Sequence, residues 1–231
     1  MESKLLRKEL IFWLSLTIAY HRNMNIELWL VTPNAEMYQA FKRSFRYLPY
    51  HQVFHCRFEE LPLHDCFVTA GNSFGIMNAG IDAAVVAFHG RDLMERIQQR
   101  ILQEYLGEQP VGSCFIEPTN NPQYPFIAHA PTMRIPKGID GTDNVYNATW
   151  SALTAVYRHN QIHSQQDQEL IKTVVFPAMG AGYGGVPFRE VARQMAVAYN
   201  HFLHPPQKLD WETVVARNKA ISYDRDKKVL N

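Results

Sequence analysis

Residues 173–202 read TVVFPAMGAGYGGVPFREVARQMAVAYNHF, and this stretch has the clearest structural pattern in the sequence. Its first four residues form an apolar run that predicts a buried strand, and residues 187–202 predict a helix with proline in its first turn. Four glycines lie between them, within residues 180–185. Glycine permits positive φ and close approach of a ligand to the backbone, and a helix N-terminus offers free N–H groups to an anion. The stretch therefore predicts a strand, a diphosphate-binding loop and a helix, with a flexible connection that binds nothing as the alternative.

The rest of the chain repeats this alternation of strands and helices. Apolar runs predict strands at residues 26–31, 53–58, 66–70, 113–116 and 126–130, and helical spacing predicts helices at 35–47, 81–89, 92–105 and 143–157. Such alternation favours an α/β class, a three-layer α/β/α domain with a mixed, largely parallel central sheet. We expect an N-terminal helical extension at 1–25, one domain at 26–204 and a C-terminal tail at 205–231.

Composition excludes several classes of protein. The 231 residues carry 23 Lys and Arg against 22 Asp and Glu, so the formal charge of +1 gives no sign of a nucleic-acid partner. Three cysteines without a CxxC pair fit neither a disulfide framework nor a common zinc site, so we expect a reducing, cytoplasmic location and no metal. The apolar run at 10–19 lacks a cleavage site and is too short to cross a bilayer, so a packing helix is preferred to a signal peptide.

The glycine pattern at 180–185 also satisfies G-x-G-x-x-G, which is typical of dinucleotide-binding Rossmann domains. That fold requires a further strand after the helix and an acidic residue about twenty positions on. Here the helix is followed by Pro205, Pro206 and Lys208 near the end of the chain. The sequence therefore disfavours a nicotinamide site.

A second loop with polar and glycine residues follows the strand at 66–70, where residues 69–82 read TAGNSFGIMNAGID. Ligands of parallel sheets bind beyond the carboxyl ends of the strands, so we expect this loop and residues 180–185 to face one cleft. Asn72 offers an amide for sugar hydroxyls, and Asp82 a carboxylate near a helix start. The alternatives are a turn role for Asn72 and a first-turn acid that only complements the helix dipole for Asp82.

Together these segments resemble the macrodomain family of ADP-ribose-binding modules. Residues 69–72 and 79–82 stand where the family commonly has N-A-A-N and G-G-V-D, and residues 180–187 match its glycine-rich loop ending in proline. Residues 126–134, FIAHAPTMR, are similar to the middle strand of a bacterial and phage-associated branch related to ADP-ribose-1″-phosphate processing proteins. The resemblance covers about residues 26–202.

The resemblance implies an ADP-ribose site and no resident cofactor. It implies that the diphosphate binds the 180–185 loop, that the adenine lies toward the first two strands, and that Asn72 and Asp82 serve the terminal ribose as catalytic residues. A carboxylate beside a diphosphate is expected to have a raised pKa, which suits a general base. The binding residues implied are Glu59, Thr69, Ala70, Asn72, Gly80, Ile81, Gly180, Ala181, Gly182, Tyr183 and Gly184.

Several positions depart from the family pattern. Thr69 replaces the first asparagine, Ala79 replaces a glycine, and Gly184 stands where many hydrolases carry an aromatic that Tyr183 would then replace. Asp65 is the alternative to Glu59 for reading adenine. His129 lies near a histidine of some members, and a structural role for it is the preferred interpretation.

The resemblance leaves two functions open. One is a hydrolase, either a mono-ADP-ribosyl hydrolase acting on a modified protein or small molecule, or an ADP-ribose-1″-phosphate phosphatase. The other is a non-catalytic reader, and the changes at Thr69 and Ala79 leave a structural or interaction module whose cleft has decayed as a further alternative. The partner of the hydrolase and of the reader is ADP-ribose or an ADP-ribosylated macromolecule, with no membrane involved and the oligomeric state left open.

Overall fold

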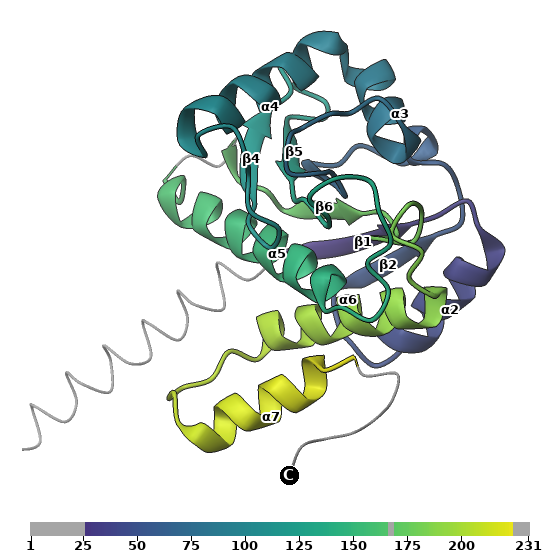
Figure 1. The fold of residues 1–231 in the computed structure, drawn as a ribbon, viewed down its shortest axis with the longest axis vertical. Helices are drawn as coiled ribbons and strands as arrows, with labels where there is room; N and C mark the ends of the chain where they lie inside the picture. The colour runs from purple at the N-terminus through teal and green to yellow at the C-terminus, as the bar shows by residue number, and fades with distance from the viewer. Residues whose placement is uncertain (1–25, 166–168, 224–231) are drawn as a thin grey trace, which may run out of the picture.

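A six-stranded mixed sheet forms the centre of the molecule (Figure 1). The computed structural model describes residues 26–165 and 169–223. The strands are β1 (Glu27–Val31), β2 (His51–Phe54), β3 (Cys66–Thr69), β4 (Phe115–Pro118), β5 (Phe126–His129) and β6 (Thr173–Phe176), in the order β2-β1-β6-β3-β5-β4. Every neighbouring pair is parallel except β4 and β5, which are antiparallel. The predicted mixed, largely parallel sheet is confirmed.

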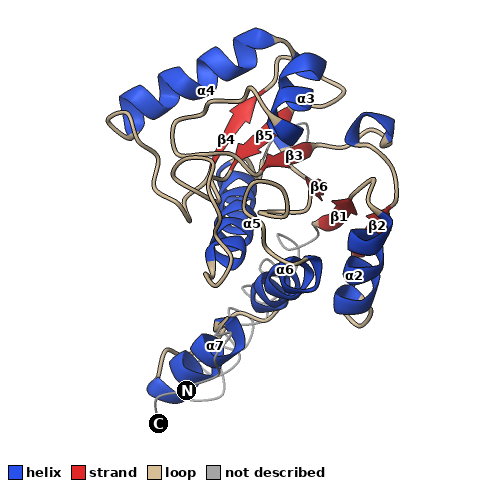
Figure 2. Cartoon of the chain, turned by 45° about the vertical axis from the view of Figure 1, so that its right-hand side comes forward, coloured by secondary structure: helices blue, strands red, loops and turns tan. Residues whose placement is uncertain are grey.

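Helices cover both faces of this sheet (Figure 2). In β1, Leu28 and Leu30 face one hydrophobic core and Trp29 and Val31 the other, as the two-residue period of a strand requires. The first core is closed by α2 (Ala35–Phe45), α5 (Asn144–Ile162) and α6 (Phe188–Leu203), and the second by the 3-10 turn η1 (Phe58–Glu60), α3 (Gly80–His89) and α4 (Arg91–Glu104). The layers are therefore α/β/α, as predicted.

Local signals set many element boundaries. The Asn34 side chain accepts a hydrogen bond of 2.9 Å from the amide of Met37, so it caps α2 as its position suggests. The second strand is shorter than predicted, because Phe58 turns into the second core within η1 rather than extending the sheet. Helix α5 runs to Ile162, five residues past its predicted end.

The segment expected as a C-terminal tail contains another helix, α7 (Trp211–Ile221). Asp210 caps it by accepting a hydrogen bond of 2.9 Å from the amide of Thr213. Figure 1 shows α7 alongside α6, away from the sheet. The N-terminal helical extension predicted at residues 1–25 lies outside the described residues.

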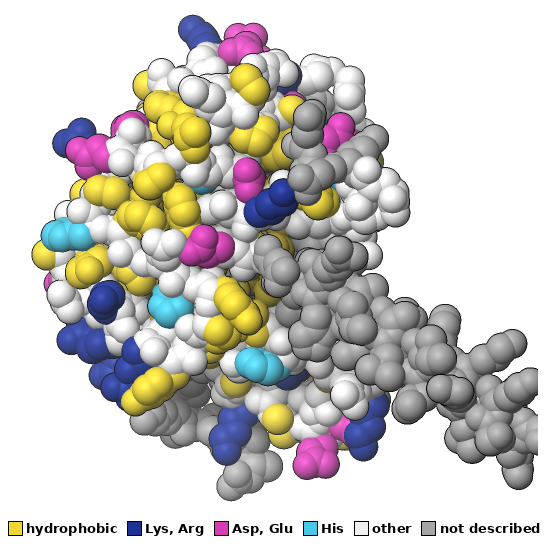
Figure 3. All heavy atoms as spheres, turned by 180° about the vertical axis from the view of Figure 1, so that it is seen from behind, with side chains coloured by type: hydrophobic (Ala, Val, Ile, Leu, Met, Phe, Trp, Pro, Cys, Tyr) yellow, Lys and Arg dark blue, Asp and Glu magenta, His cyan; other side chains and the backbone are white. Residues whose placement is uncertain are grey.

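The surface agrees with the near-zero formal charge. Figure 3 shows side chains of both signs on the rear face of the molecule, interspersed with apolar ones. Among residues 26–165 and 169–223, no helix is long and apolar enough to cross a membrane.

Candidate functional site

A cleft lies at the carboxyl ends of the central strands and has two connected pockets. The smaller, of about 130 Å³, is lined by residues that follow β3 and β6, including Asn72, Asp82 and Gly182. The larger, of about 510 Å³, extends toward β1 and η1. Gly80, Ile81, Ala178 and Gly182 line both. The structure thus brings together the two loops that the sequence predicted to share a cleft.

The glycine loop, residues 180–185, presents unpaired backbone amides. The amides of Gly182, Tyr183 and Gly184 donate to no acceptor within the described part of the chain, whereas that of Gly185 donates to the carbonyl of Gly182 at 3.0 Å. Successive free N–H groups in a turn form a concave anion site. The glycine loop therefore has the donors that an oxyanion or phosphate needs.

The packing of the glycine loop explains which of its residues must lack a side chain. A Cβ on Gly184 would lie 2.3 Å from the carbonyl oxygen of Gly180 and 2.9 Å from the Ile139 side chain. Gly180 has φ +75° and would also clash, with Val145. A Cβ on Gly182 meets nothing within 4 Å, so this residue borders open space in the cleft. An aromatic at position 184 would not fit here, while the exposed Tyr183 lines the smaller pocket.

The start of α3 forms the opposite wall of the cleft. Gly80 has φ +58° and, with Ile81, lines both pockets at the N-terminus of this ten-residue helix. First-turn amides have no acceptor within the helix, and the dipole gives this end a partial positive charge. The cleft thus carries two sets of anion donors, one on the glycine loop and one on α3.

Among the described residues, Asp82 carries the only carboxyl group that lines the smaller pocket. Its side chain is 7% exposed, and its buried Oδ1 has no hydrogen-bond partner among the described residues. Burial raises the pKa of the Asp82 carboxyl to about 7, because desolvation disfavours the charged form. The raised pKa agrees in direction with the sequence-based expectation, although here burial alone produces it. A carboxyl that titrates near neutrality can take up and release a proton.

Asn72 lies in the same pocket but uses its amide within its own loop. Its Nδ2 donates to the carbonyl of Ile76 at 2.8 Å, and its Oδ1 accepts from the amides of Phe74 at 3.1 Å and Ile76 at 3.3 Å. These contacts match the turn role that the sequence offered as an alternative. Asn72 therefore fixes the shape of the loop that borders the pocket, and one N–H of its amide remains without such a contact.

His129 supports this loop from beneath. Gln109 Nε2 donates to the His129 carbonyl at 3.2 Å, so Gln109 Oε1 must accept from His129 Nδ1 at 2.6 Å. Burial lowers the pKa of His129 to about 4, so the ring is neutral. Its Nε2 faces Gly71, where a Cβ would lie 2.6 Å away. His129 does not line either pocket, and the structural interpretation holds.

The larger pocket is mainly apolar and carries one acid. Met37, Phe58 and Phe188 contribute apolar surface, and Glu59 and Arg57 lie at its edge. Among the described residues, the Glu59 carboxylate has no hydrogen-bond or ion-pair partner, so it is available to a ligand. Asp65, the alternative acid, accepts from the amides of Lys172 and Thr173 at 2.7 and 2.8 Å, where β6 begins. This is the amino end of the parallel strands, opposite the end that carries the cleft. Asp65 is therefore not a cleft residue.

The remaining predicted site residues divide into lining and buried ones. Ala70 and Gly180 line the smaller pocket and Ala181 the larger. Thr69 is completely buried in β3 and lines neither pocket, and its expected contact with the ligand stays a prediction. The lining of the smaller pocket that the sequence did not single out comprises Ile76, Asn78, Ala79, Thr132, Met133, Pro136 and Ala178. Met133 and Pro136 lie in the segment at residues 130–136, APTMRIP, whose resemblance to the middle strand of the family could have indicated that they border the cleft.

Within the described ranges 26–165 and 169–223, no three His, Cys, Asp or Glu side chains gather in a way that would hold a metal ion.

Comparisons with known proteins agree with this architecture. The family model described as Macro domain matches residues 68–195. An uncharacterized protein of Aeropyrum pernix is 30% identical over 134 residues, covering 58% of this chain and 62% of the relative's length. The match thus spans less than two thirds of that relative.

Solved structures of the Oceanobacillus iheyensis macrodomain share the fold. A variant with ADPR bound has a TM-score of 0.51 and 21% identity, over 62% of this chain and 73% of that one. The same macrodomain with ADP has a TM-score of 0.51 and 21% identity, over 62% and 72%. The form with MES bound has a TM-score of 0.51 and 18% identity, over 69% and 84%.

Proposed function

This chain belongs to the macrodomain family, and we propose that its cleft binds ADP-ribose and hydrolyses the bond between the terminal ribose and an attached group. The observation that carries the proposal is the pairing of free amides on the glycine loop with the N-terminus of α3 across one cleft. Two such donor sets suit a diphosphate, which presents anionic oxygens on both sides. The O. iheyensis structures with ADPR and ADP support a ligand of this class.

The two pockets divide the ligand between them. The larger, apolar pocket has the size and lining for the adenine and its ribose, with Glu59 available to accept a hydrogen bond from the adenine amino group. The diphosphate then lies at Gly80 and Gly182, which both pockets share. The terminal ribose enters the smaller pocket, beside Asp82.

Asp82 is the proposed general base. Its carboxylate takes a proton from a water molecule, the water oxygen forms a bond to the anomeric carbon of the terminal ribose, and the bond from that carbon to the attached group breaks. The attached group leaves with the electron pair and receives the proton that Asp82 took from the water, so ADP-ribose is released and the carboxylate is regenerated. A pKa of about 7 leaves a substantial share of the carboxyl ionised at neutral pH while keeping it a useful base.

Asn72 contributes by holding the loop and by offering its remaining N–H to a ribose hydroxyl. Its other amide contacts set the turn of residues 72–76. A fixed loop places the ribose against Asp82 without an ordering cost at each turnover. Asn72 is thus both a turn residue and a candidate ligand contact.

A non-catalytic reader is the second candidate function. Two features favour it: Asn72 is already engaged within its loop, and Ala79 stands where the family commonly has glycine. Binding through the glycine loop needs neither a base nor a free Asn72. The two functions therefore differ in turnover and not in binding.

Calorimetry with ADP-ribose tests the binding step. The wild-type chain should bind one equivalent, and Gly182→Glu should weaken binding at least about a hundredfold by placing a negative charge among the phosphate donors. Gly138→Glu is the matched control, because a Cβ there also meets nothing within 4 Å and the residue lines neither pocket. Equal binding by both variants would remove the proposed phosphate site.

Turnover of a mono-ADP-ribosylated protein tests the chemical step. Asp82→Ala should abolish release of ADP-ribose while retaining binding. Release by the wild-type chain that survives in Asp82→Ala would exclude Asp82 as the base. Binding without any release by the wild-type chain would favour the reader.

A further inference from the structure

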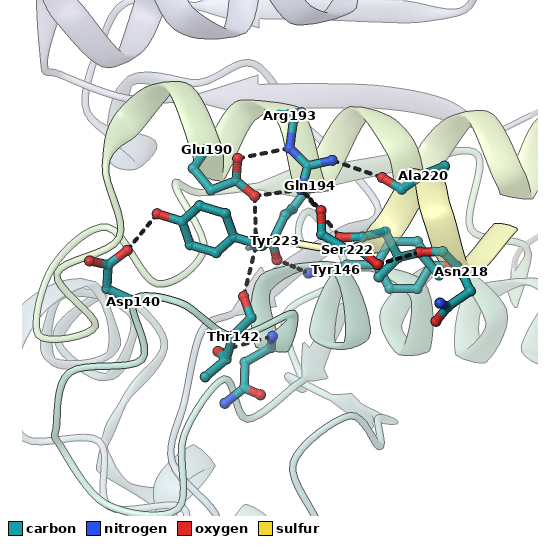
Figure 4. Close-up of polar contacts among 12 residues, drawn as sticks. Asp140, Thr142, Tyr146, Glu190, Arg193, Gln194, Asn218, Ala220, Ser222 and Tyr223 are labelled. Carbon is teal, nitrogen blue, oxygen red and sulfur yellow. Dashed lines mark hydrogen bonds and ion pairs between the residues drawn. The ribbon is translucent and has the colours of Figure 1, made fainter. Parts of the chain in front are cut away.

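Helix α7 is attached to the domain mainly through polar contacts at its C-terminus (Figure 4). None of its residues is buried. Arg193 on α6 donates to the carbonyls of Ala220, Ile221 and Ser222 at 2.8, 3.2 and 3.3 Å. The last carbonyls of a helix receive no hydrogen bond from within the helix. A guanidinium at this end donates to them, and its positive charge complements the helix dipole. Arg193 therefore caps α7 from a neighbouring helix.

Arg193 is itself held by a second polar layer. The Glu190 carboxylate accepts two hydrogen bonds from the Arg193 guanidinium, at 2.7 Å from Nε and 2.6 Å from Nη2. The same carboxylate accepts from Gln194 Nε2 at 3.0 Å, and Gln194 Nε2 also donates to the carbonyl of Thr142 at 2.9 Å. Gln194 is fully buried. The contacts thus continue from α7 through α6 to the segment that precedes α5.

A shorter connection reaches the same segment directly. Tyr223, which follows α7, donates from its hydroxyl to Asp140 Oδ1 at 2.6 Å. Figure 4 shows the Tyr223 side chain directed at Asp140, close to Glu190. The end of the α7 segment therefore holds residues 139–142 through Tyr223 as well as through Arg193.

Residues 139–142 are the support of the glycine loop. The amide of Ile139 donates to the carbonyl of Gly184 at 2.8 Å. The Ile139 side chain is buried and lies where a Cβ on Gly180 or Gly184 would clash, at 3.0 and 2.9 Å. Thr142 closes the segment by donating from its hydroxyl to the carbonyl of Ile139 at 2.6 Å. A shift of this segment would move the glycine loop with it.

We propose that residues 211–223 form a brace that holds the glycine loop in its anion-binding shape, with Arg193 and Tyr223 as positioning residues. This inference rests on the proposed function only for the identity of the ligand, ADP-ribose. The family model ends at residue 195, so the brace lies beyond the matched region. A loop fixed before the ligand arrives loses less conformational freedom on binding, and this strengthens affinity.

Two variants of the full chain test the brace: Tyr223→Phe removes the hydroxyl that holds Asp140, and Arg193→Met removes the cap. We measure affinity for ADP-ribose and for adenosine, which carries no phosphate and so does not use the free amides of the glycine loop. ADP-ribose affinity should fall about three- to tenfold in each variant, the range expected when a coupled element is released. Adenosine affinity should stay at the wild-type value.

Tyr199→Phe is the matched control. The Tyr199 hydroxyl donates to the carbonyls of Pro49 and Tyr50 at 3.0 and 2.9 Å, near the start of β2 and away from the cleft. This variant loses a buried phenol contact and should lower thermal stability without changing affinity for either ligand. Equal losses of ADP-ribose and adenosine affinity in the brace variants would indicate a general loss of structure and overturn the proposal.

Hydrogen exchange of the unliganded chain separates this proposal from the function. The hydrogen-bonded amides of Ile139, Ala181, Gly185 and Val186 should exchange faster in Tyr223→Phe and Arg193→Met than in the wild type and in Tyr199→Phe. Unchanged exchange in both brace variants overturns the brace. Faster exchange in the two brace variants, together with a wild-type chain that fails to bind ADP-ribose, would support the brace and remove the proposed function.

Discussion

Replacing Asp82 with asparagine should stabilise the protein at neutral and alkaline pH. The Asp82 carboxyl is buried without a partner for Oδ1, and its pKa is raised to about 7 from an ordinary value of 3.8. In the unfolded chain the group ionises near its ordinary value. Between these two values the folded state binds more protons than the unfolded state, so stability falls as pH rises. Asparagine does not ionise, and the variant lacks this loss.

The size of the effect follows from the two pKa values. They differ by about three, and a tenfold change in proton affinity corresponds to about 1.4 kcal/mol, so ionisation of Asp82 costs about 4 kcal/mol once the pH exceeds 7. Below pH 4 the carboxyl is protonated in both states, and the contribution disappears. The stability of Asp82→Asn relative to wild type should thus increase from pH 4 to pH 7 and then remain constant.

Urea unfolding of both chains at several pH values between 4 and 8.5 measures this difference. Any cost of the asparagine amide itself is the same at each pH and cancels in the comparison. Leu, or another residue that changes the volume, is unsuitable because it adds a packing term. A difference that stays flat across this range would show that Asp82 titrates normally, and the argument for a base tuned by burial would be refuted.

Three further substitutions test individual contacts. Gly184→Ala should lower stability by about 1–3 kcal/mol and weaken ADP-ribose binding, because its Cβ would lie 2.3 Å from the Gly180 carbonyl oxygen, whereas Gly182→Ala should unfold at the wild-type temperature; equal melting curves would contradict this. Glu59→Ala should weaken ADP-ribose binding about tenfold in calorimetry. Binding of the analogue in which hypoxanthine replaces adenine should be nearly unchanged, because hypoxanthine lacks the amino group that Glu59 accepts from. Parallel losses of affinity for both ligands would exclude Glu59 as the adenine contact. Asn72→Ala should lose about 1–2 kcal/mol in urea unfolding together with turnover, and an undiminished stability would show that its turn contacts are dispensable.

Strong local patterns made the cleft predictable from sequence. One continuous pattern covers the strand at Thr173–Phe176, the glycine loop and the helix after Pro187. The local structure follows directly from it, because glycine permits the turn and proline favours the helix start. The placement of Asp82 followed from the same kind of signal, a loop after a strand and before a helix. The common edge of parallel strands then brought both loops together.

Other features depend on tertiary contacts that the pattern does not encode. Helix α7 buries no side chain, so its sequence lacks the apolar face by which helices are recognised, and a cap from Arg193 stabilises it instead. An asparagine in a loop can hydrogen-bond either its own turn or a ligand, and the residue type alone does not say which. In the structure Asn72 hydrogen-bonds the carbonyl of Ile76. The resemblance implies a ligand contact for Thr69, whereas β3 lies between β6 and β5 and all four of its residues are buried.

An amide NMR titration of the full chain with ADP-ribose tests whether the free amides of the glycine loop and of α3 bind the diphosphate. The resonances of Gly182, Tyr183, Gly184 and the first turn of α3 should shift together and saturate at one equivalent, because their free N–H groups receive the diphosphate. Shifts confined to residues outside the cleft, or no shifts at millimolar ligand, would contradict the account.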